Sequence, residues 1–205
     1  GGLDFKYFKY DHVKQGRRQP GSTFKPFVYT SAIDGPKDLS PCYMMRDEPF
    51  EIEVENAKGE KEMWRPGNAN GSFSMREMPI KRALAQSINS VTARLTNEVG
   101  ADTVMYYAKK MGIKSPLKAV ASIGLGSFDV NLFEMIGAYS AFVNEGMHVE
   151  PMLVQEIKDQ NGKRFEYDIR ALAHDLMVRQ GLLRDAPSLS LANTGPAALA
   201  KLKHR

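Results

Sequence analysis

The sequence is short of cysteine. Cys42 is the only one among 205 residues, so the chain has no intramolecular disulfide and no zinc site built from cysteines. It also has no apolar run of about 18 residues, the length that a membrane-spanning helix requires. Neither a signal peptide nor an initiator methionine is present at Gly1-Gly2, and we therefore expect an interior piece of a longer protein. These features do not indicate the cellular compartment of the protein.

Charge of one sign is not in large excess either. The chain has 28 Lys+Arg against 24 Asp+Glu and a net charge of +4. Its basic residues are interleaved with acidic ones, apart from Arg17-Arg18. Because nucleic-acid binding requires a clustered basic face, we expect no nucleic-acid partner. The histidines lack the spacing of a metal site; they are His12, His148, His174 and His204.

The composition is that of a globular protein, and apolar residues recur at helical spacing. Hydrophobic residues make up 42%, enough for a sizeable core. Apolar spacing predicts a buried helix over residues 22–33, with Ser22 as N-cap and Gly35-Pro36 as the stop. The same spacing predicts two helices over 78–99 separated by a polar break, a helix over 101–111 ended by Gly112, and a helix over 131–145.

The helix over 131–145 is expected to turn its apolar residues inward; they are Leu132, Met135, Ile136, Tyr139 and Phe142. Period-two alternation predicts a strand over 50–55 with a hairpin turn at 57–60, and a strand over 152–157 turning at 159–162. After about residue 167 the sequence is rich in Ala, Leu and Arg and has no aromatic residue. We therefore separate residues 1–167 from a divergent tail, 168–205.

Ser22-Thr23-Phe24-Lys25 has the spacing of a nucleophile and its base. Residues three apart share one helix face, so the Lys25 amine can reach the Ser22 hydroxyl and, with a pKa lowered by burial, take its proton. The N–H groups of the helix start can face a developing oxyanion. The S-x-x-K pattern is also found as an N-capping serine followed by a solvated lysine, so taken alone it does not decide between the two.

Ser87-Ile88-Asn89 supplies a second hydroxyl and a carboxamide, at the polar break between two apolar helices. The S-x-N spacing lets both side chains point from one turn into one cavity. There Ser87 can relay a proton, and Asn89 can hold Lys25 and a substrate amide. Serine and asparagine are also ordinary residues of helix boundaries, so the value of the motif lies in its combination with Ser22 and Lys25.

Four ordered segments carry a resemblance to a known family. Arg18-Gln19-Pro20-Gly21-Ser22-Thr23-Phe24-Lys25-Pro26-Phe27-Val28-Tyr29 resembles the nucleophile segment of class A penicillin-binding proteins, whose S-x-x-K, S-x-N and K-[ST]-G motifs form one set. The other three follow in the family's order: Trp64-Arg65-Pro66-Gly67-Asn68 with Gly71, Ala83-Leu84-Ala85-Gln86-Ser87-Ile88-Asn89, and Ser122-Ile123-Gly124-Leu125-Gly126 with Glu134-Met135-Ile136-Gly137-Ala138-Tyr139. The resemblance covers about residues 1–167, and a chance occurrence of all four is very improbable.

The resemblance implies an α+β fold of the penicillin-binding protein and β-lactamase type, with helices packed on a five-stranded antiparallel sheet that is incomplete at the C-terminus. It implies a D,D-transpeptidase that cross-links peptidoglycan stem peptides ending in D-Ala-D-Ala. The acyl-enzyme would form on Ser22, with Lys25 as general base, while Ser87 and Asn89 complete the proton path and grip the peptide. The implied substrate-binding residues are Trp64, Asn68 and Gly124.

The resemblance also implies partners and a location. β-Lactams would acylate the nucleophile as substrate mimics, and no metal or organic cofactor is implied. The parent protein would be a bifunctional cell-wall synthase on the extracytoplasmic (periplasmic) side of the cell membrane. Its membrane anchor and glycosyltransferase domain would lie upstream of Gly1.

One motif of the family is missing. A K-[ST]-G strand should follow residues 152–157, but the sequence contains neither Lys-Thr-Gly nor Lys-Ser-Gly, and the nearest string, Asn193-Thr194-Gly195, lacks the cation. In the family this strand binds the substrate carboxylate and helps form the oxyanion hole, and loss of one oxyanion donor costs about 100- to 1000-fold in rate. We therefore expect this chain alone to be inactive or nearly so. We also expect that residues after about 167 do not continue the family sequence.

Two other functions stay open. A serine β-lactamase requires a deacylating carboxylate on a loop, for which the sequence offers no distinctive residue. A non-catalytic sensor or binding module that recognises penicillin is favoured by the missing K-[ST]-G motif. The lifetime of a covalent penicillin label distinguishes these functions from a transpeptidase.

Overall fold

A computed structural model describes residues 6–55, 59–152, 156–158 and 160–162. The chain divides into two compact units, one of residues 12–150 and one that joins residues 1–11 to residues 151–205. The second unit lies mostly outside the described residues, and in its described part the rings of Phe8 and Tyr10 meet edge to face at 6.5 Å. The site residues all belong to the first unit.

A 3₁₀ turn, η1 (Gly21–Phe24), leads directly into helix α1 (Lys25–Ile33). Pro26 fits the first turn of α1 because the N–H that it lacks has no intrahelical partner there. The predicted helix over 22–33 is therefore confirmed, with a tighter first turn. Ser22 is not its N-cap: it lies inside η1, and no side chain caps either helix start.

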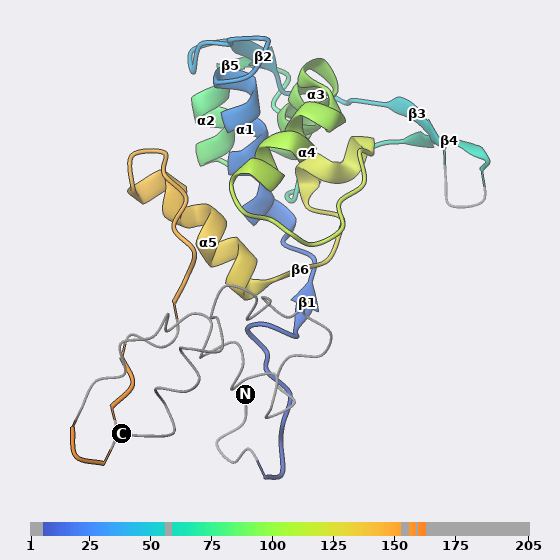
Figure 1. Ribbon diagram of the computed structural model, residues 1–205. Helices are drawn as coiled ribbons and strands as arrows, with labels where there is room; N and C mark the ends of the chain where they lie inside the picture. The colour runs from blue at the N-terminus through green and yellow to red at the C-terminus, as the bar shows by residue number, and fades with distance from the viewer. Residues whose placement is uncertain (1–5, 56–58, 153–155, 159, 163–205) are drawn as a thin grey trace. The chain divides into compact units, whose positions relative to one another are not determined.

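The next helices are α2 (Ile80–Ala85), α3 (Asn89–Val99) and α4 (Ala101–Lys110). The predicted polar break at Ser87-Ile88-Asn89 separates α2 from α3. Figure 1 shows α1 among these three helices, and it contacts each of them. A second 3₁₀ turn, η2 (Ala121–Leu125), packs against α3 and α4.

The strands form three separate antiparallel pairs within the described part of the chain. β1 (Arg17–Arg18) pairs with β6 (Val130–Asn131), and β2 (Met44–Arg46) pairs with β5 (Glu77–Pro79). β3 (Ile52–Glu55) and β4 (Lys61–Trp64) form the predicted hairpin, which extends away from the helices in Figure 1. The five-stranded sheet implied by the family resemblance is not found among the described residues.

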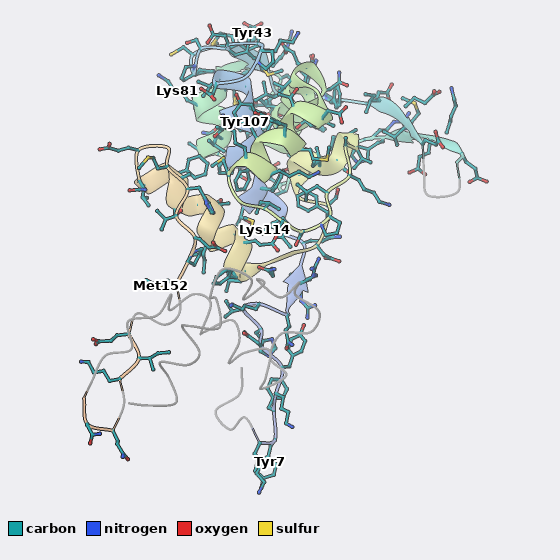
Figure 2. All side chains as sticks on the ribbon, in the orientation of Figure 1. Tyr7, Tyr43, Lys81, Tyr107, Lys114 and Met152 are labelled. Atoms are coloured by element: carbon teal, nitrogen blue, oxygen red, sulfur yellow. The ribbon has the colours of Figure 1, made fainter. Side chains whose placement is uncertain are left out.

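At the β2–β5 pair, backbone bonds fasten the start of α2 to the segment before β2. The Ile80 N–H donates to the Tyr43 carbonyl at 2.9 Å, and the Lys81 N–H donates to the Pro41 carbonyl at 3.1 Å. Tyr43 and Lys81 are labelled at this end of the helices in Figure 2. The segment before β2 is thereby held beside the start of α2.

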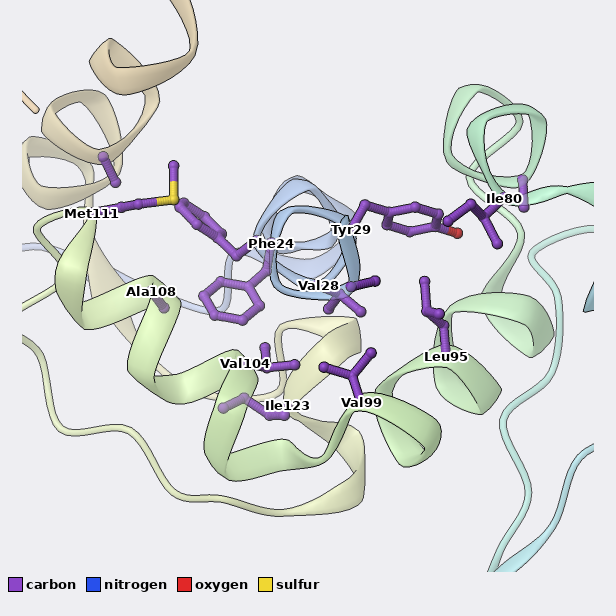
Figure 3. Packing of buried hydrophobic residues seen from close by; sticks show 14 of the residues in the cluster. Phe24, Val28, Tyr29, Ile80, Leu95, Val99, Val104, Ala108, Met111 and Ile123 are labelled. Carbon is purple, nitrogen blue, oxygen red and sulfur yellow. The ribbon is translucent and has the colours of Figure 1, made fainter. Parts of the chain in front are cut away.

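The core lies where α1, α3, α4 and η2 meet. Figure 3 shows Phe24 of η1 and Val28 of α1 facing Val104 of α4 and Ile123 of η2. All four side chains are fully buried. Phe24 also meets Phe128 edge to face, with ring centroids 4.6 Å apart. Burying aromatic side chains of this size is a large part of the stability of a small core.

Helix α5 (Leu132–Val143) departs from the sequence prediction. Met135 is buried, but Leu132, Ile136 and Phe142 are 53%, 51% and 45% exposed, and Tyr139 is at the margin with 36%. The prediction that all five face inward is wrong, because periodicity locates an apolar face without showing what covers it. The Tyr139 and Phe142 rings still touch the Phe27 ring of α1 edge-on and tilted.

Three predictions fall on residues that the structure does not describe in full. Of the strand predicted over 152–157, residues 153–155 lie outside the described residues. The boundary at residue 167 and the Asn193-Thr194-Gly195 string lie entirely outside them. Within the described segments, no helix is both long enough and apolar enough to span a bilayer.

Candidate active site

Lys25 is a buried cation at the centre of the first unit. It is the first residue of α1, and its side chain is only 1% exposed. A lysine that is buried away from water must find acceptors for its three N–H groups. The buried ammonium of Lys25 therefore destabilises the fold unless hydrogen-bond acceptors surround it.

Three acceptors surround the Lys25 Nζ atom, and all come from the polar break between α2 and α3. They are the Ser87 carbonyl at 2.7 Å, the Ser87 Oγ at 2.9 Å and the Asn89 Oδ1 at 2.6 Å. Residues 62 and 64 positions apart in the sequence are thus joined in one cluster. The alternative of a solvated lysine after a capping serine does not fit this geometry.

Burial changes the acidity of Lys25. Desolvation lowers the pKa of its ammonium from 10.5 to about 8, because a low-dielectric environment disfavours the charged form. An amine with this pKa is neutral in part of the molecules near pH 7 to 8, and a neutral amine can accept a proton. Lys25 has the properties of a general base.

Ser87 reaches Lys25 through an unusual backbone conformation. Its φ is +54°, in the left-handed region where non-glycine residues are rare. The Ile88 N–H donates to the Ala83 carbonyl at 3.0 Å, and the Ser87 N–H donates to the Leu84 carbonyl at 2.9 Å. These two bonds are the Schellman ending of a helix, which places Ser87 where glycine is usual. The left-handed residue directs both its carbonyl and its hydroxyl at Lys25.

Ser22 lies exposed in η1, one turn before Lys25. Among the described residues its hydroxyl makes no hydrogen bond, so it is open to a substrate. The Lys25 N–H donates to the Ser22 carbonyl, which fixes the two residues on one continuous turn. All three Lys25 ammonium protons point to Ser87 and Asn89, so Ser22 is not a partner of the charged form.

Gly126 supports the Ser22 turn from the other side. Its carbonyl accepts the Gly21 N–H at 3.3 Å, and its φ is +69°. A Cβ at Gly126 would meet the backbone of Gly21 at less than 3 Å. In the sequence, Gly126 stands out only as the last residue of the Ser122-Ile123-Gly124-Leu125-Gly126 segment that carries the family resemblance. The close backbone approach of Gly126 to the Ser22 turn was not predicted.

The other predicted site residues differ in how close they lie to this cluster. Asn68 lies beside it, since its Oδ1 accepts the Asn89 N–H at 3.0 Å. Trp64 ends β4 opposite Ile52 and makes no described hydrogen bond to the cluster. Gly124 is buried in η2, where a Cβ would collide with Thr96. The structure thus shows a packing role for Gly124, and its predicted substrate contact stays a prediction.

Asp47 is a buried carboxylate that the sequence analysis missed. It is 2% exposed and accepts hydrogen bonds from Asn68, Ser90 and the Ser74 N–H. Burial acts to raise the pKa of its carboxyl, but these hydrogen bonds together hold it below the usual value. Asp47 follows a short strand in an irregular segment, so no periodicity or motif could have singled it out.

The described residues contain no group of three or more His, Cys, Asp or Glu side chains suited to a metal ion. The side chains of the cluster and of the Ser22 turn supply a serine hydroxyl, an amine of lowered pKa, a second hydroxyl and a carboxamide. Such a set is suited to acyl transfer through a covalent intermediate.

The Penicillin binding protein transpeptidase domain matches residues 6–181 of this sequence. The chain belongs to this family. The predicted resemblance to penicillin-binding proteins is thereby confirmed.

The chain is similar to parts of longer penicillin-binding proteins. Penicillin-binding protein 1A from Rickettsia felis is 39% identical over 163 residues, which make up 80% of this chain and 20% of that protein. Penicillin-binding protein 2D from Bacillus subtilis is 33% identical over 162 residues, or 79% of this chain and 23% of that protein. The chain thus spans about a fifth of the length of these relatives.

Solved penicillin-binding proteins confirm the predicted α+β fold. Penicillin-Binding Protein 1A from Haemophilus influenzae has a TM-score of 0.70 and 29% identity, covering 80% of this chain and 24% of that one. The PonA1 protein from Mycobacterium tuberculosis, at 22% identity and a TM-score of 0.62, covers 78% of this chain and 43% of that one and shows the fold alone. The described helices and antiparallel pairs agree with this fold.

Proposed function

We propose that this transpeptidase-family chain carries the nucleophile half of a serine-type D,D-transpeptidase site, in which Ser22 forms the acyl-enzyme and Lys25 is the general base. The observation that carries the proposal is the cluster in which the buried Lys25 ammonium donates to Ser87 and Asn89. It joins the S-x-x-K and S-x-N motifs into one arrangement that suits acyl transfer.

The first step is removal of the Ser22 proton. A serine hydroxyl attacks an amide only when a base takes its proton, and the Lys25 pKa of about 8 provides a neutral amine at moderate pH. The neutral amine keeps two N–H groups for Ser87 and Asn89. Its lone pair then accepts the Ser22 proton, directly or through the Ser87 hydroxyl.

In acylation, Ser22 Oγ forms a bond to the carbonyl carbon of the penultimate D-Ala of a stem peptide. The bond from that carbon to the nitrogen of the terminal D-Ala breaks, and the proton held by Lys25 passes to the leaving amine. An amine of a neighbouring strand then attacks the ester carbon and forms the cross-link amide, and the bond from that carbon to Ser22 Oγ breaks. The proton that this amine loses passes through Lys25 to Ser22 Oγ. A β-lactam would follow the first half only. The structural neighbour from Mycobacterium tuberculosis is in complex with penicillin V.

The proposal assigns four further residues to substrate binding or to support of the site: Asn89, Trp64, Asn68 and Gly124. Asn89 is the best supported, because its carboxamide already bonds Lys25 and the Gly67 carbonyl. No metal or organic cofactor takes part in the proposed reaction.

The chain alone is proposed to be nearly inactive. The sequence contains no K-[ST]-G motif, and without the oxyanion donor that such a strand supplies the rate falls by about 100- to 1000-fold. From composition we propose residues 1–167 as the partial transpeptidase domain and 168–205 as a divergent tail. The family match runs past that boundary, to residue 181. The parent protein is proposed to be a membrane-anchored, bifunctional synthase that acts on peptidoglycan at the extracytoplasmic face.

A non-catalytic penicillin-recognising module is the second candidate, because the missing motif removes turnover without removing Ser22. A β-lactamase is less well supported. Among the described residues no carboxylate is hydrogen-bonded to Lys25, Ser87 or Asn89, and the oxygens of the nearby Asp47 are taken by Ser90, Asn68 and Ser74. A deacylating carboxylate must instead be free to bind a water molecule.

The test is covalent labelling by a fluorescent penicillin, followed by intact-mass and peptide-mass analysis. We expect little label within minutes and a small adduct after hours, located on Ser22 and absent from Ser22→Ala. Thr23→Ala is the matched control, because it removes a neighbouring exposed hydroxyl whose one bond within the described segments is to the Pro20 carbonyl.

Each outcome separates the candidates. Equal label on the parent and Ser22→Ala contradicts the proposed nucleophile. Rapid, robust label that Ser22→Ala abolishes shows that the K-[ST]-G strand is dispensable and contradicts the proposed inactivity. Label that forms and is lost within minutes indicates a β-lactamase.

A further inference from the structure

Asp47 is held firmly at the edge of the β2–β5 pair. Its N–H donates to the Arg76 carbonyl at 3.0 Å, and its own carbonyl accepts the Met75 N–H at 2.9 Å. These bonds continue the pairing of the two strands beyond Arg46, with Asp47 on one side and Arg76 and Met75 on the other. The side chain therefore has a fixed origin from which its carboxylate reaches α3.

The carboxylate accepts hydrogen bonds from three described groups, and the Ser74 hydroxyl also acts to lower its pKa. Its Oδ1 accepts from the Ser90 hydroxyl at 2.6 Å and from the Asn68 Nδ2 at 2.8 Å, and its Oδ2 accepts from the Ser74 N–H at 2.8 Å. No described ion pair involves Asp47. Neutral donors and the positive end of the eleven-residue helix α3 compensate its charge.

The bond from Asn68 to Asp47 fixes the orientation of the Asn68 carboxamide. Its Nδ2 donates to the carboxylate and to the Ser72 carbonyl, so its Oδ1 must face the other way. There the Oδ1 accepts the N–H groups of Asn89 and Ser90 at 3.0 and 3.1 Å. The first N–H groups of a helix have no partner within it, and here Asn68 supplies one.

Asn89, once held by its N–H, turns its side chain to Lys25. Its Nδ2 donates to the Gly67 carbonyl at 2.8 Å, which leaves its Oδ1 to accept from Lys25 at 2.6 Å. An unbroken series of hydrogen bonds thus runs from Asp47 through Asn68 and Asn89 to Lys25.

We propose that Asp47 is a positioning residue, whose buried carboxylate orients Asn68 so that Asn68 caps α3 and places the Asn89 carboxamide on Lys25. The inference rests on the proposed function only in calling Lys25 the base. An asparagine at position 47 has one acceptor oxygen and one amino group where three donors converge. One donor must then face another donor in a buried site, and such an unsatisfied group is costly.

The test is amide hydrogen exchange by NMR on the 205-residue chain. In Asp47→Asn we expect the Asn89 and Ser90 amides to exchange at least about tenfold faster, since their acceptor is released. Asp102→Asn is the matched control: it makes the same chemical change in the exposed first turn of α4 and should leave both amides unchanged. Met45→Ala, a buried neighbour on β2, controls for general loss of stability.

A second readout follows the Lys25 amine by NMR titration. Loosening the Asn89 acceptor that now bonds Lys25 disfavours the ammonium, so the pKa of Lys25 should fall in Asp47→Asn and not in Asp102→Asn or Met45→Ala. If Asp47→Asn does not fold, Ser90→Ala removes one of the three bonds and should show the same changes at smaller size.

Unchanged exchange at Asn89 and Ser90 in a folded Asp47→Asn, or equal changes in Met45→Ala, overturns the inference. Neither readout requires acylation of Ser22. Failure of the proposed function and failure of this inference are therefore seen separately.

Discussion

Helices α2 and α4 end in the same way, yet with different residues at the left-handed position. In α4 the Ile113 N–H donates to the Ala108 carbonyl and the Gly112 N–H to the Lys109 carbonyl, and Gly112 has a φ of +111°. In α2 the same pair of bonds surrounds Ser87, whose φ is +54°. Glycine takes such a conformation without strain, whereas serine does so at a cost of about 1 kcal/mol.

The difference shows what each ending is for. Gly112 only stops a helix, and it has no side chain to use. Ser87 also stops a helix, but its hydroxyl and carbonyl hold Lys25. A strained residue that a glycine could replace is retained when its side chain has a function, so this comparison supports the assignment of Ser87 to the site.

The largest expected effect comes from removing the cation that Ser87 holds. The Lys25 pKa is about 8 in the folded chain, against 10.5 for a lysine side chain in water. The folded chain therefore binds fewer protons than the unfolded chain between these values, and its stability rises with pH from about 8 to 10.5. The slope of the unfolding free energy against pH approaches about 1 kcal/mol per pH unit.

The variant Lys25→Met lacks this slope. Urea unfolding of both chains at pH 7, 8, 9 and 10 measures the difference between their unfolding free energies. A constant difference across that range would contradict the lowered pKa.

The Gly112 ending should tolerate a side chain poorly. Gly112→Ala forces a positive φ on alanine and brings a Cβ against the His148 ring, so we expect a loss of about 1–3 kcal/mol in the free energy of unfolding. Gly146→Ala is the control, since Gly146 has a φ of +83° and a Cβ added there would meet no atom within 4 Å. Thermal unfolding of the two variants separates strain from collision. An equal loss in both would assign the whole effect to the backbone.

Ser87→Gly should change the free energy of unfolding in the opposite direction to Gly112→Ala. The strain is relieved, so we expect a gain of about 0.5–1 kcal/mol in the free energy of unfolding, together with less Ser22 adduct in the penicillin assay. Ser87→Ala keeps the strain and loses only the hydroxyl, and it separates the two effects. A chain that Ser87→Gly destabilises would show that the hydroxyl contributes more to folding than the strain costs.

The smallest effect is expected on α5. Leu132→Ala removes a side chain that is 53% exposed and should change stability by less than about 0.5 kcal/mol. Leu95→Ala, the same change at a fully buried position of α3, should cost about 2–5 kcal/mol. Light scattering should also show less self-association in Ile136→Ser than in the parent, because exposed apolar residues favour association. Equal stability losses for the two leucine variants would mean that α5 is covered in solution.

Periodicity predicted helices α1 to α5 and the β3–β4 hairpin, because each has its own apolar pattern and a stop signal such as Gly112. The motifs predicted Lys25, Ser87 and Asn89 as a group, and the structure brings these three together. The sequence could not show Asp47, since its partners lie 21 and 43 residues away and no local pattern marks a carboxylate that only neutral donors satisfy. Periodicity also placed Ile136 inside, because an apolar helix face does not show which other elements cover it.

The Ser22 turn depends on contacts made late in the chain. Gly21 bonds Gly126, Arg18 pairs with Val130, and the Thr23 carbonyl accepts the Tyr139 hydroxyl across 116 residues. During synthesis, which runs from the N-terminus, helix α1 can form long before these partners have emerged from the ribosome. Contacts of such sequence separation form slowly. The Ser22 turn, although near the beginning of this sequence, should therefore be among the last parts of the first unit to reach its final geometry.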